Sequence, residues 1–103
     1  MNSTEKTELL FTQLILMFQT AALQQMGKLK NPVSDAIERD LAQAQISIDL
    51  LEMLRTKSKG NLSVAEEKIL SNVLQELKLN YVDEVSKSQA PPPQQPPEGS
   101  IPS

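Results

Sequence analysis

The chain has 103 residues, a formal net charge of −3 and neither cysteine nor histidine. Without cysteine there are no disulfides and no thiolate metal sites, and without histidine the commonest general base and transition-metal ligand are missing. The charge is spread thinly, so no segment is basic enough to indicate binding to a nucleic-acid backbone. A domain this small is marginally stable alone, and a partner chain is the usual support that remains.

The first helix is predicted to span residues 5–26 and to end at Gly27. Ser3 or Thr4 is its expected N-cap. The polar start of the chain lacks the basic and apolar regions of a secretory signal. A cytoplasmic location is therefore expected.

This helix contains nineteen consecutive uncharged residues, from Leu9 to Gly27. At 100° per residue its apolar positions form two stripes. The broad stripe, expected to pack within the chain, comprises Leu10, Phe11, Leu14, Ile15, Met17, Phe18, Ala21, Ala22 and Met26. The narrow stripe comprises Leu9, Leu16 and Leu23. A helix facing water normally carries Lys and Glu on that side, so this helix is predicted to be covered on nearly all sides.

The second helix is predicted over residues 35–59, after a loop at 27–34 that contains Pro32. Ser34 is its expected N-cap. Its main apolar stripe resembles a coiled-coil seam and comprises Ile37, Leu41, Ala44, Ile48 and Leu51. A second stripe, on the opposite side, comprises Ala42, Ile46, Leu50 and Met53.

The corner that follows has the most specific local pattern in the chain. Lys57 suits the negative end of the second helix, and Gly60 suits a left-handed C′ position. Ser63 and Glu66 form a capping box that starts the third helix. So short a connection predicts antiparallel neighbouring helices. The residues assigned to this structural corner are Asp49, Lys57, Gly60, Asn61, Leu62, Ser63 and Glu66.

The third helix is predicted over residues 64–85, with one apolar stripe. That stripe comprises Leu70, Val73, Leu74, Leu77, Tyr81 and Val85. Residues 88–103 are rich in proline and have no apolar periodicity, so a disordered tail is predicted. The tail is expected to be a solubilising extension; the alternative is a docking peptide for a polyproline-binding groove.

With the corner placed, the sequence resembles a small bacterial family of all-helical domains of unknown function, DUF1844, over about residues 10–83. The matching residues are Phe11, Thr12, Leu14, Ile15, Leu16, Asn31, Pro32, Ile48, Asp49, Leu50, Leu51, Leu54, Lys57, Gly60, Asn61, Leu62, Glu66, Glu67, Leu70, Leu74, Leu77, Tyr81 and Val82. The chain departs from the family pattern at Val33-Ser34, and mildly at Ser58 and Lys78. The resemblance implies a short all-helical fold and supplies no activity, ligand or catalytic residue.

Three polar groups are candidate sites, and each has a structural explanation. Asp49 interrupts an apolar stretch, but a lone carboxylate is a poor catalytic constellation. Glu66 and Glu67 suit a helix N-terminus better than a metal site. Gly60-Asn61 follows a helix, whereas a phosphate-binding loop is glycine-rich and follows a strand. We therefore predict no catalytic, cofactor-binding or metal-ligating residue and no cofactor.

The uncharged segment of the first helix approaches the length of a membrane span. Polar side chains along it argue against a span; they are Thr12, Gln13, Gln19, Thr20, Gln24 and Gln25. A membrane-surface helix remains the alternative. A helix-turn-helix reader of DNA would need a basic recognition helix, which the second and third helices lack.

The sequence thus predicts an all-α fold of three helices with an antiparallel hairpin, assembled into a homodimer or higher symmetric oligomer. The expected interface comprises Leu9, Leu16, Leu23, Ala42, Ile46, Leu50 and Met53. The expected function is a non-enzymatic oligomeric interaction module, an adaptor or regulator. The alternative is a peripheral membrane or membrane-complex component that uses the first helix, and an enzyme using Asp49, Glu66 or Tyr81 is a more distant possibility.

Overall fold

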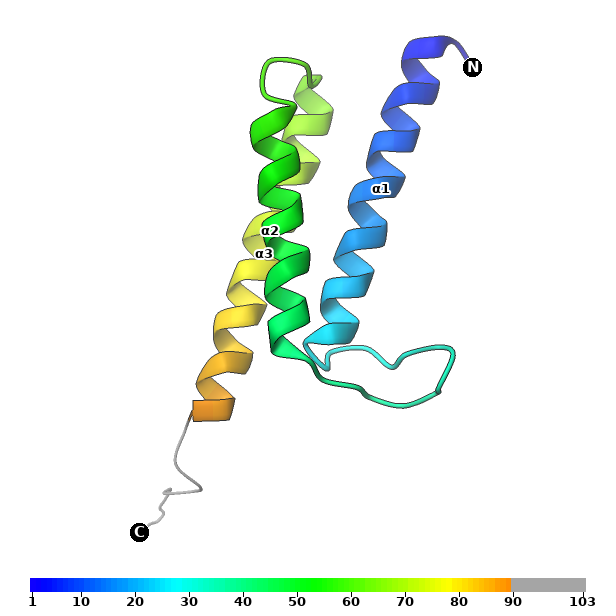
Figure 1. The fold of residues 1–103 in the computed structure, drawn as a ribbon. Coiled ribbons are helices and arrows are strands. Elements are labelled where there is room, and N and C mark those ends of the chain that lie inside the picture. Colours follow the sequence, from blue (N-terminus) through cyan, green and yellow to red (C-terminus); the bar gives the residue numbers. More distant parts are fainter. Residues whose placement is uncertain (90–103) are drawn as a thin grey trace, which may run out of the picture.

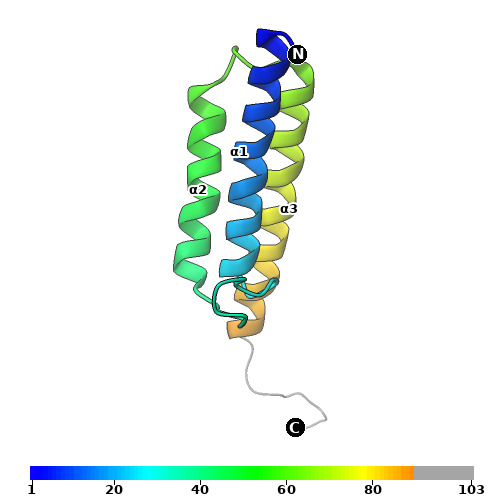
Figure 2. The ribbon, with the colours of Figure 1, turned by 90° about the vertical axis from the view of Figure 1, so that its right-hand side faces the viewer.

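A computed structural model describes residues 1–89 as three helices joined by two connections. Helix α1 spans Ser3–Gln25, α2 spans Leu41–Lys57 and α3 spans Val64–Gln89. The helices run up and down the bundle in turn, and α2 and α3 form a hairpin (Figure 1). Figure 2 looks onto α1, which lies in front of α2 and α3. The predicted all-α fold with an antiparallel hairpin is confirmed.

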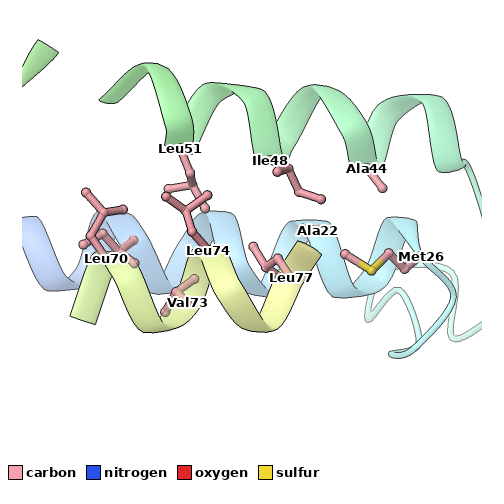
Figure 3. Close-up of a cluster of buried hydrophobic side chains, with 10 residues drawn as sticks. Ala22, Met26, Ala44, Ile48, Leu51, Leu70, Val73, Leu74 and Leu77 are labelled. Atoms are coloured by element: carbon pink, nitrogen blue, oxygen red, sulfur yellow. The ribbon is translucent and has the colours of Figure 1, made fainter. Parts of the chain in front are cut away.

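The core is a single apolar cluster to which each helix contributes one edge (Figure 3). Its buried members are Ile15, Ala22, Met26, Ala44, Ile48, Leu51, Leu70, Val73, Leu74 and Leu77. The members from α2 and α3 are those that the apolar periodicity predicts. Each of the larger side chains contributes about 1.5–3 kcal/mol through its removal from water. All three pairs of helices are in contact across this cluster.

The N-terminus of α1 is capped one residue earlier than Ser3 or Thr4, the expected caps. The side chain of Asn2 accepts a hydrogen bond from the Glu5 amide at 2.8 Å, and the Glu5 carboxylate accepts one from the Asn2 amide at 3.0 Å. This is a capping box, and its Asn-x-x-Glu spacing is present in the sequence.

The C-terminus of α1 lies where Gly27 predicts it. Gly27 adopts a φ of +84°. Its amide donates to the Gln24 carbonyl at 3.0 Å, and the Lys28 amide donates to the Leu23 carbonyl at 2.8 Å. This pair of bonds is the Schellman motif, which favours glycine at the left-handed position.

The predicted start of the second helix is wrong. Residues 31–36 close a turn instead, in which the Asn31 side chain accepts a hydrogen bond from the Val33 amide at 2.9 Å. Asp35 has a φ of +55°, and Asn31 and Ala36 form an isolated β-bridge. Local hydrogen bonds from an asparagine side chain compete with helix formation, so Ser34 does not act as an N-cap.

Helix α2 begins at Leu41, and Asp40 is its N-cap. The Asp40 side chain accepts a hydrogen bond from the Gln43 amide at 3.0 Å. The Asp40 amide donates to the Gln25 carbonyl at 2.7 Å, which joins the start of α2 to the end of α1. Ile37, placed in the main stripe by its spacing, therefore lies in the connection and is exposed.

The predicted left-handed Gly60 and the predicted Ser63–Glu66 capping box between α2 and α3 are confirmed. Gly60 has a φ of +86°. The Glu66 amide donates to the Ser63 hydroxyl at 3.1 Å, and the Ser63 amide donates to the Glu66 carboxylate at 2.8 Å. Leu62 packs partly buried against the core.

Helix α3 continues to Gln89, four residues beyond its predicted end at Val85. Ser88 and Gln89, assigned to the tail by composition, are therefore helical. The remainder of the predicted proline-rich tail lies outside the described residues.

Replacing Gly60 tests the left-handed position in isolation. No heavy atom lies within 4 Å of the place where a Cβ would stand, so Gly60→Ala creates backbone strain without a steric clash. We expect Gly60→Ala to lower the free energy of unfolding by about 1 kcal/mol, measured by urea denaturation. Asparagine tolerates this conformation better, so Gly60→Asn should cost less. An alanine variant as stable as the wild type would contradict this explanation.

Candidate functional site

From Leu9 onward, the outer face of α1 is mostly apolar, uncharged and largely uncovered. Only one edge of the helix is buried, because α2 and α3 reach it from the same side (Figure 2). Met17 is 68% exposed and Leu10 is 55% exposed. Leu9, Leu14 and Leu16 are also exposed. The expectation that this helix is covered on nearly all sides is wrong for the chain by itself.

The two predicted stripes of α1 are divided differently in the structure. Leu10, Leu14 and Met17 were expected to pack within the chain and face outward instead. Leu23 was expected on the free narrow stripe and packs partly buried against the core. The inner edge comprises Phe11, Ile15, Phe18, Ala22 and Met26.

Uncharged polar residues of α1 have two different roles. Gln19 Nε2 donates to the Glu76 carboxylate of α3 at 2.6 Å, and Gln25 Oε1 accepts from the Ser47 hydroxyl of α2 at 2.7 Å. These two side chains attach α1 to its neighbours. Three others lie outward, where they border a shallow hollow together with apolar residues. The lining of this hollow is Gln13, Leu16, Met17, Thr20, Ala21 and Gln24.

The outer stripe of α2 continues this surface. The Ser47–Gln25 hydrogen bond marks the flanks on which α2 and α1 face each other. Leu50 follows Ser47 by three residues and Ala21 precedes Gln25 by four, so they lie on these same flanks. The predicted stripe of α2 is exposed throughout, as expected; it comprises Ala42, Ile46, Leu50 and Met53.

The comparisons with known proteins give a family and no function. A family model described as Domain of unknown function (DUF1844) matches residues 8–83. The chain belongs to the DUF1844 family. No match to it is found among curated proteins, and none among solved structures.

In this DUF1844 chain, the densest group of charges lies at the end of the bundle opposite the α2–α3 corner. Glu84 is only 7% exposed. Its carboxylate lies 2.8 Å from Lys28 Nζ and 3.2 Å from Arg39 Nη2, and Arg39 also donates to the Glu84 backbone carbonyl at 2.6 Å. Lys28 and Arg39 both belong to the α1–α2 connection. The group therefore attaches that connection to α3.

The hydrogen bonds of this cluster shift the pKa values of its members. Hydrogen bonds to Lys28 and, to a smaller extent, to Lys87 lower the pKa of Glu84. Asp83, which also bonds to these two lysines, has a lowered pKa as well. The pKa of Lys28 is raised, chiefly by its hydrogen bond to Glu84 and then by that to Asp83. Each shift favours the charged form, as is typical of a structural ion cluster.

Asp49 lies in the middle of α2, away from the corner to which the sequence assigned it. Its carboxylate accepts a hydrogen bond from Gln45 Nε2 at 2.8 Å. A surface groove between α2 and α3 contains both Asp49 and Tyr81. The same groove contains the ion pair between Glu52 and Lys78. Its charged side chains thus have partners within the groove, an arrangement that suits packing between two helices.

The remaining corner residues have structural positions. Lys57 is the last residue of α2, and Glu66 is occupied by the capping box. Among residues 1–89, no group of three or more acidic side chains is placed to hold a metal ion. No helix in that range is long and apolar enough to cross a membrane.

Sequence reasoning missed three features that the structure shows, two of which depend on the tertiary structure. The ion pair between Lys28 and Glu84 joins residues 56 positions apart, so no local sequence pattern predicts it. The outward position of Leu10 and Met17 also depends on where α2 and α3 lie. The Asn2–Glu5 capping box, by contrast, was readable from its spacing.

Glu84→Gln tests the ion cluster through its pH dependence. The pKa of Glu84 in the folded protein is below 4.5, its ordinary value. The charged form therefore stabilises the fold above that value, and the contribution is lost as the pH falls through the lowered pKa. We expect Glu84→Gln to be less stable than the wild type at neutral pH and to have a flatter acid profile in urea denaturation.

The matched control is Glu76→Gln on the same helix, whose partner Gln19 is uncharged. This variant should keep the steeper acid profile of the wild type. An unchanged acid profile in Glu84→Gln would show that the cluster does not couple folding to pH.

Proposed function

We propose that this protein is a non-enzymatic interaction module that self-associates through the outer face of α1 and acts as an adaptor or regulator. The observation that carries the proposal is the uncharged segment from Leu9 to Gly27, of which the fold covers only one edge. An exposed apolar surface of this kind is typical of a protein-binding face.

The size of the surface supports a stable partner. Large apolar side chains on the outer faces of α1 and α2 are each between 38% and 68% exposed; they are Leu9, Leu10, Leu14, Leu16, Met17, Ile46, Leu50 and Met53. Together they present on the order of 700 Å², close to the roughly 800 Å² that each partner buries in a standard interface. Apolar patches on monomers are usually about 300–600 Å².

The distribution of charge supports the same function. The charged side chains of the Glu84 cluster and of the α2–α3 groove bond to one another and hold the bundle together. The lining of the hollow on the outer face of α1, in contrast, has no acid or base: its polar members are Gln13, Thr20 and Gln24, so no base is present there to activate the Thr20 hydroxyl. Association is the property that such a face provides.

A membrane surface is the competing occupant of this face. Helices that lie on membranes usually carry Lys and Arg beside the apolar face, because these residues contact the lipid headgroups. Helix α1 carries no charge from Leu9 to the end of the helix. A protein partner is therefore the better fit.

The test is the association state at micromolar concentration, measured by light scattering. We expect the wild type to be a dimer or higher oligomer and Met17→Glu to be monomeric, because a buried unpaired charge at an interface is costly. The matched control is Leu79→Glu: Leu79 lies on α3 and is 66% exposed, nearly as much as Met17. Leu79→Glu should associate like the wild type.

Two results would contradict the proposal. One is a folded wild-type monomer at these concentrations. The other is co-sedimentation of the wild type, but not Met17→Glu, with vesicles of phosphatidylcholine and phosphatidylglycerol, which would indicate the membrane alternative.

A further inference from the structure

The outer face of α1 has two unlike halves. The N-terminal half carries the exposed leucines of α1, among them Leu10 at 55% and Leu14 at 38%. The C-terminal half carries no exposed large apolar side chain, and its Thr20, Ala21 and Gln24 line one side of the shallow hollow, which extends back to Gln13. Met17 lies between the halves and is the most exposed of the large apolar residues on α1. One half thus offers projections, and the other offers space.

We propose that the occupant of this face is a second copy of the chain, whose α1 packs antiparallel across it about a twofold axis that passes beside Met17. This inference rests on the proposed function and adds the partner and its orientation. In such a pair, residues at nearly equal distances from Met17 in opposite directions meet. Leu14 of each copy then enters the hollow beside Ala21 of the other, and Leu10 lies against Gln24.

The unlike halves favour the antiparallel arrangement over a parallel one. A parallel pair brings each residue to its own copy, so Leu10 and Leu14 crowd their equivalents while the small residues Thr20 and Ala21 face theirs across a gap. Crowding at one end and a void at the other both cost stability, because interfaces pack as densely as protein interiors. The antiparallel pair places the leucines of one copy against the small residues of the other, and the helix dipoles are also opposed.

The same axis accounts for the outer stripe of α2. A twofold axis that runs across the helices keeps α2 of both copies on the same side of the α1 pair. Because Ser47 contacts Gln25, Met53 is the member of the stripe nearest the level of Met17, and it then lies closest to its counterpart. An isologous contact of this kind uses the same patch on both copies. The centre of such a dimer consists of four helices, α1 and α2 of each copy.

Single-cysteine variants test the arrangement directly, because the natural chain contains no cysteine. The full-length variants Met17→Cys, Leu14→Cys, Ala21→Cys and Leu79→Cys are treated with a short bis-maleimide after light scattering. We expect Met17→Cys to form a covalent dimer by itself. Leu14→Cys mixed with Ala21→Cys should cross-link at least tenfold more than either variant by itself, and Leu79→Cys on α3 should remain unlinked.

The outcomes separate the failure of this arrangement from the failure of the proposed function. Efficient self-linking of Leu14→Cys and of Ala21→Cys, with no gain on mixing, would show a parallel pair and overturn the inference. A wild-type dimer in which Met17→Cys does not link would also overturn it, while self-association would stand. A wild-type monomer would overturn both.

Discussion

The packing of α1 into the seam between α2 and α3 is the contact on which the rest of the structure depends. Ile15, Ala22 and Met26 are fully buried there, among the apolar edges of the other two helices. Two helices reach a third from one side only, as Figure 2 shows. The burial that stabilises the chain therefore leaves most of the uncharged surface of α1 uncovered. The one-sided packing of α1 thus both stabilises the chain and leaves an apolar surface exposed.

Polar contacts at the two ends of the bundle decide how α1 lies in that seam. At one end, Lys28 and Arg39 attach the α1–α2 connection to Glu84 of α3. Near it, the Gln25 side chain holds Ser47, and the Gln25 carbonyl accepts from Asp40. At the other end, the corner of Gly60 and its capping box orients α3 against α2. The contacts at the first end attach α1 to α2 and α3 and so fix which of its sides faces outward.

A surface of this chemistry is suited to recognition. The side chains at the centre of the outer face are a flexible thioether, amides and a hydroxyl beside leucines, and none carries charge. Methionine adapts to the shape of a partner, and amides and hydroxyls accept water or protein equally well. Such a surface is compatible both with contact with water and with close packing against a protein. Membership of the DUF1844 family agrees with this fold and assigns no chemistry to it.

The sequence by itself determined the local structure: the three helices, the glycine at the end of α1, the corner at residues 60–66 and the apolar edges of α2 and α3. Each of these depends on residues within a few positions of one another, so spacing and capping chemistry suffice. The tertiary structure decided which side of α1 is covered, because periodicity shows that Met17 and Ile15 are apolar but not where the other helices lie. It also decided that residues 31–40 are not helical, since the Asn31 turn and the Arg39–Glu84 contact outweigh the helical spacing of Ile37. The sequence thus predicted that the candidate interface is apolar, because this depends only on which residues are present. Which of these residues are exposed depends on how the three helices pack.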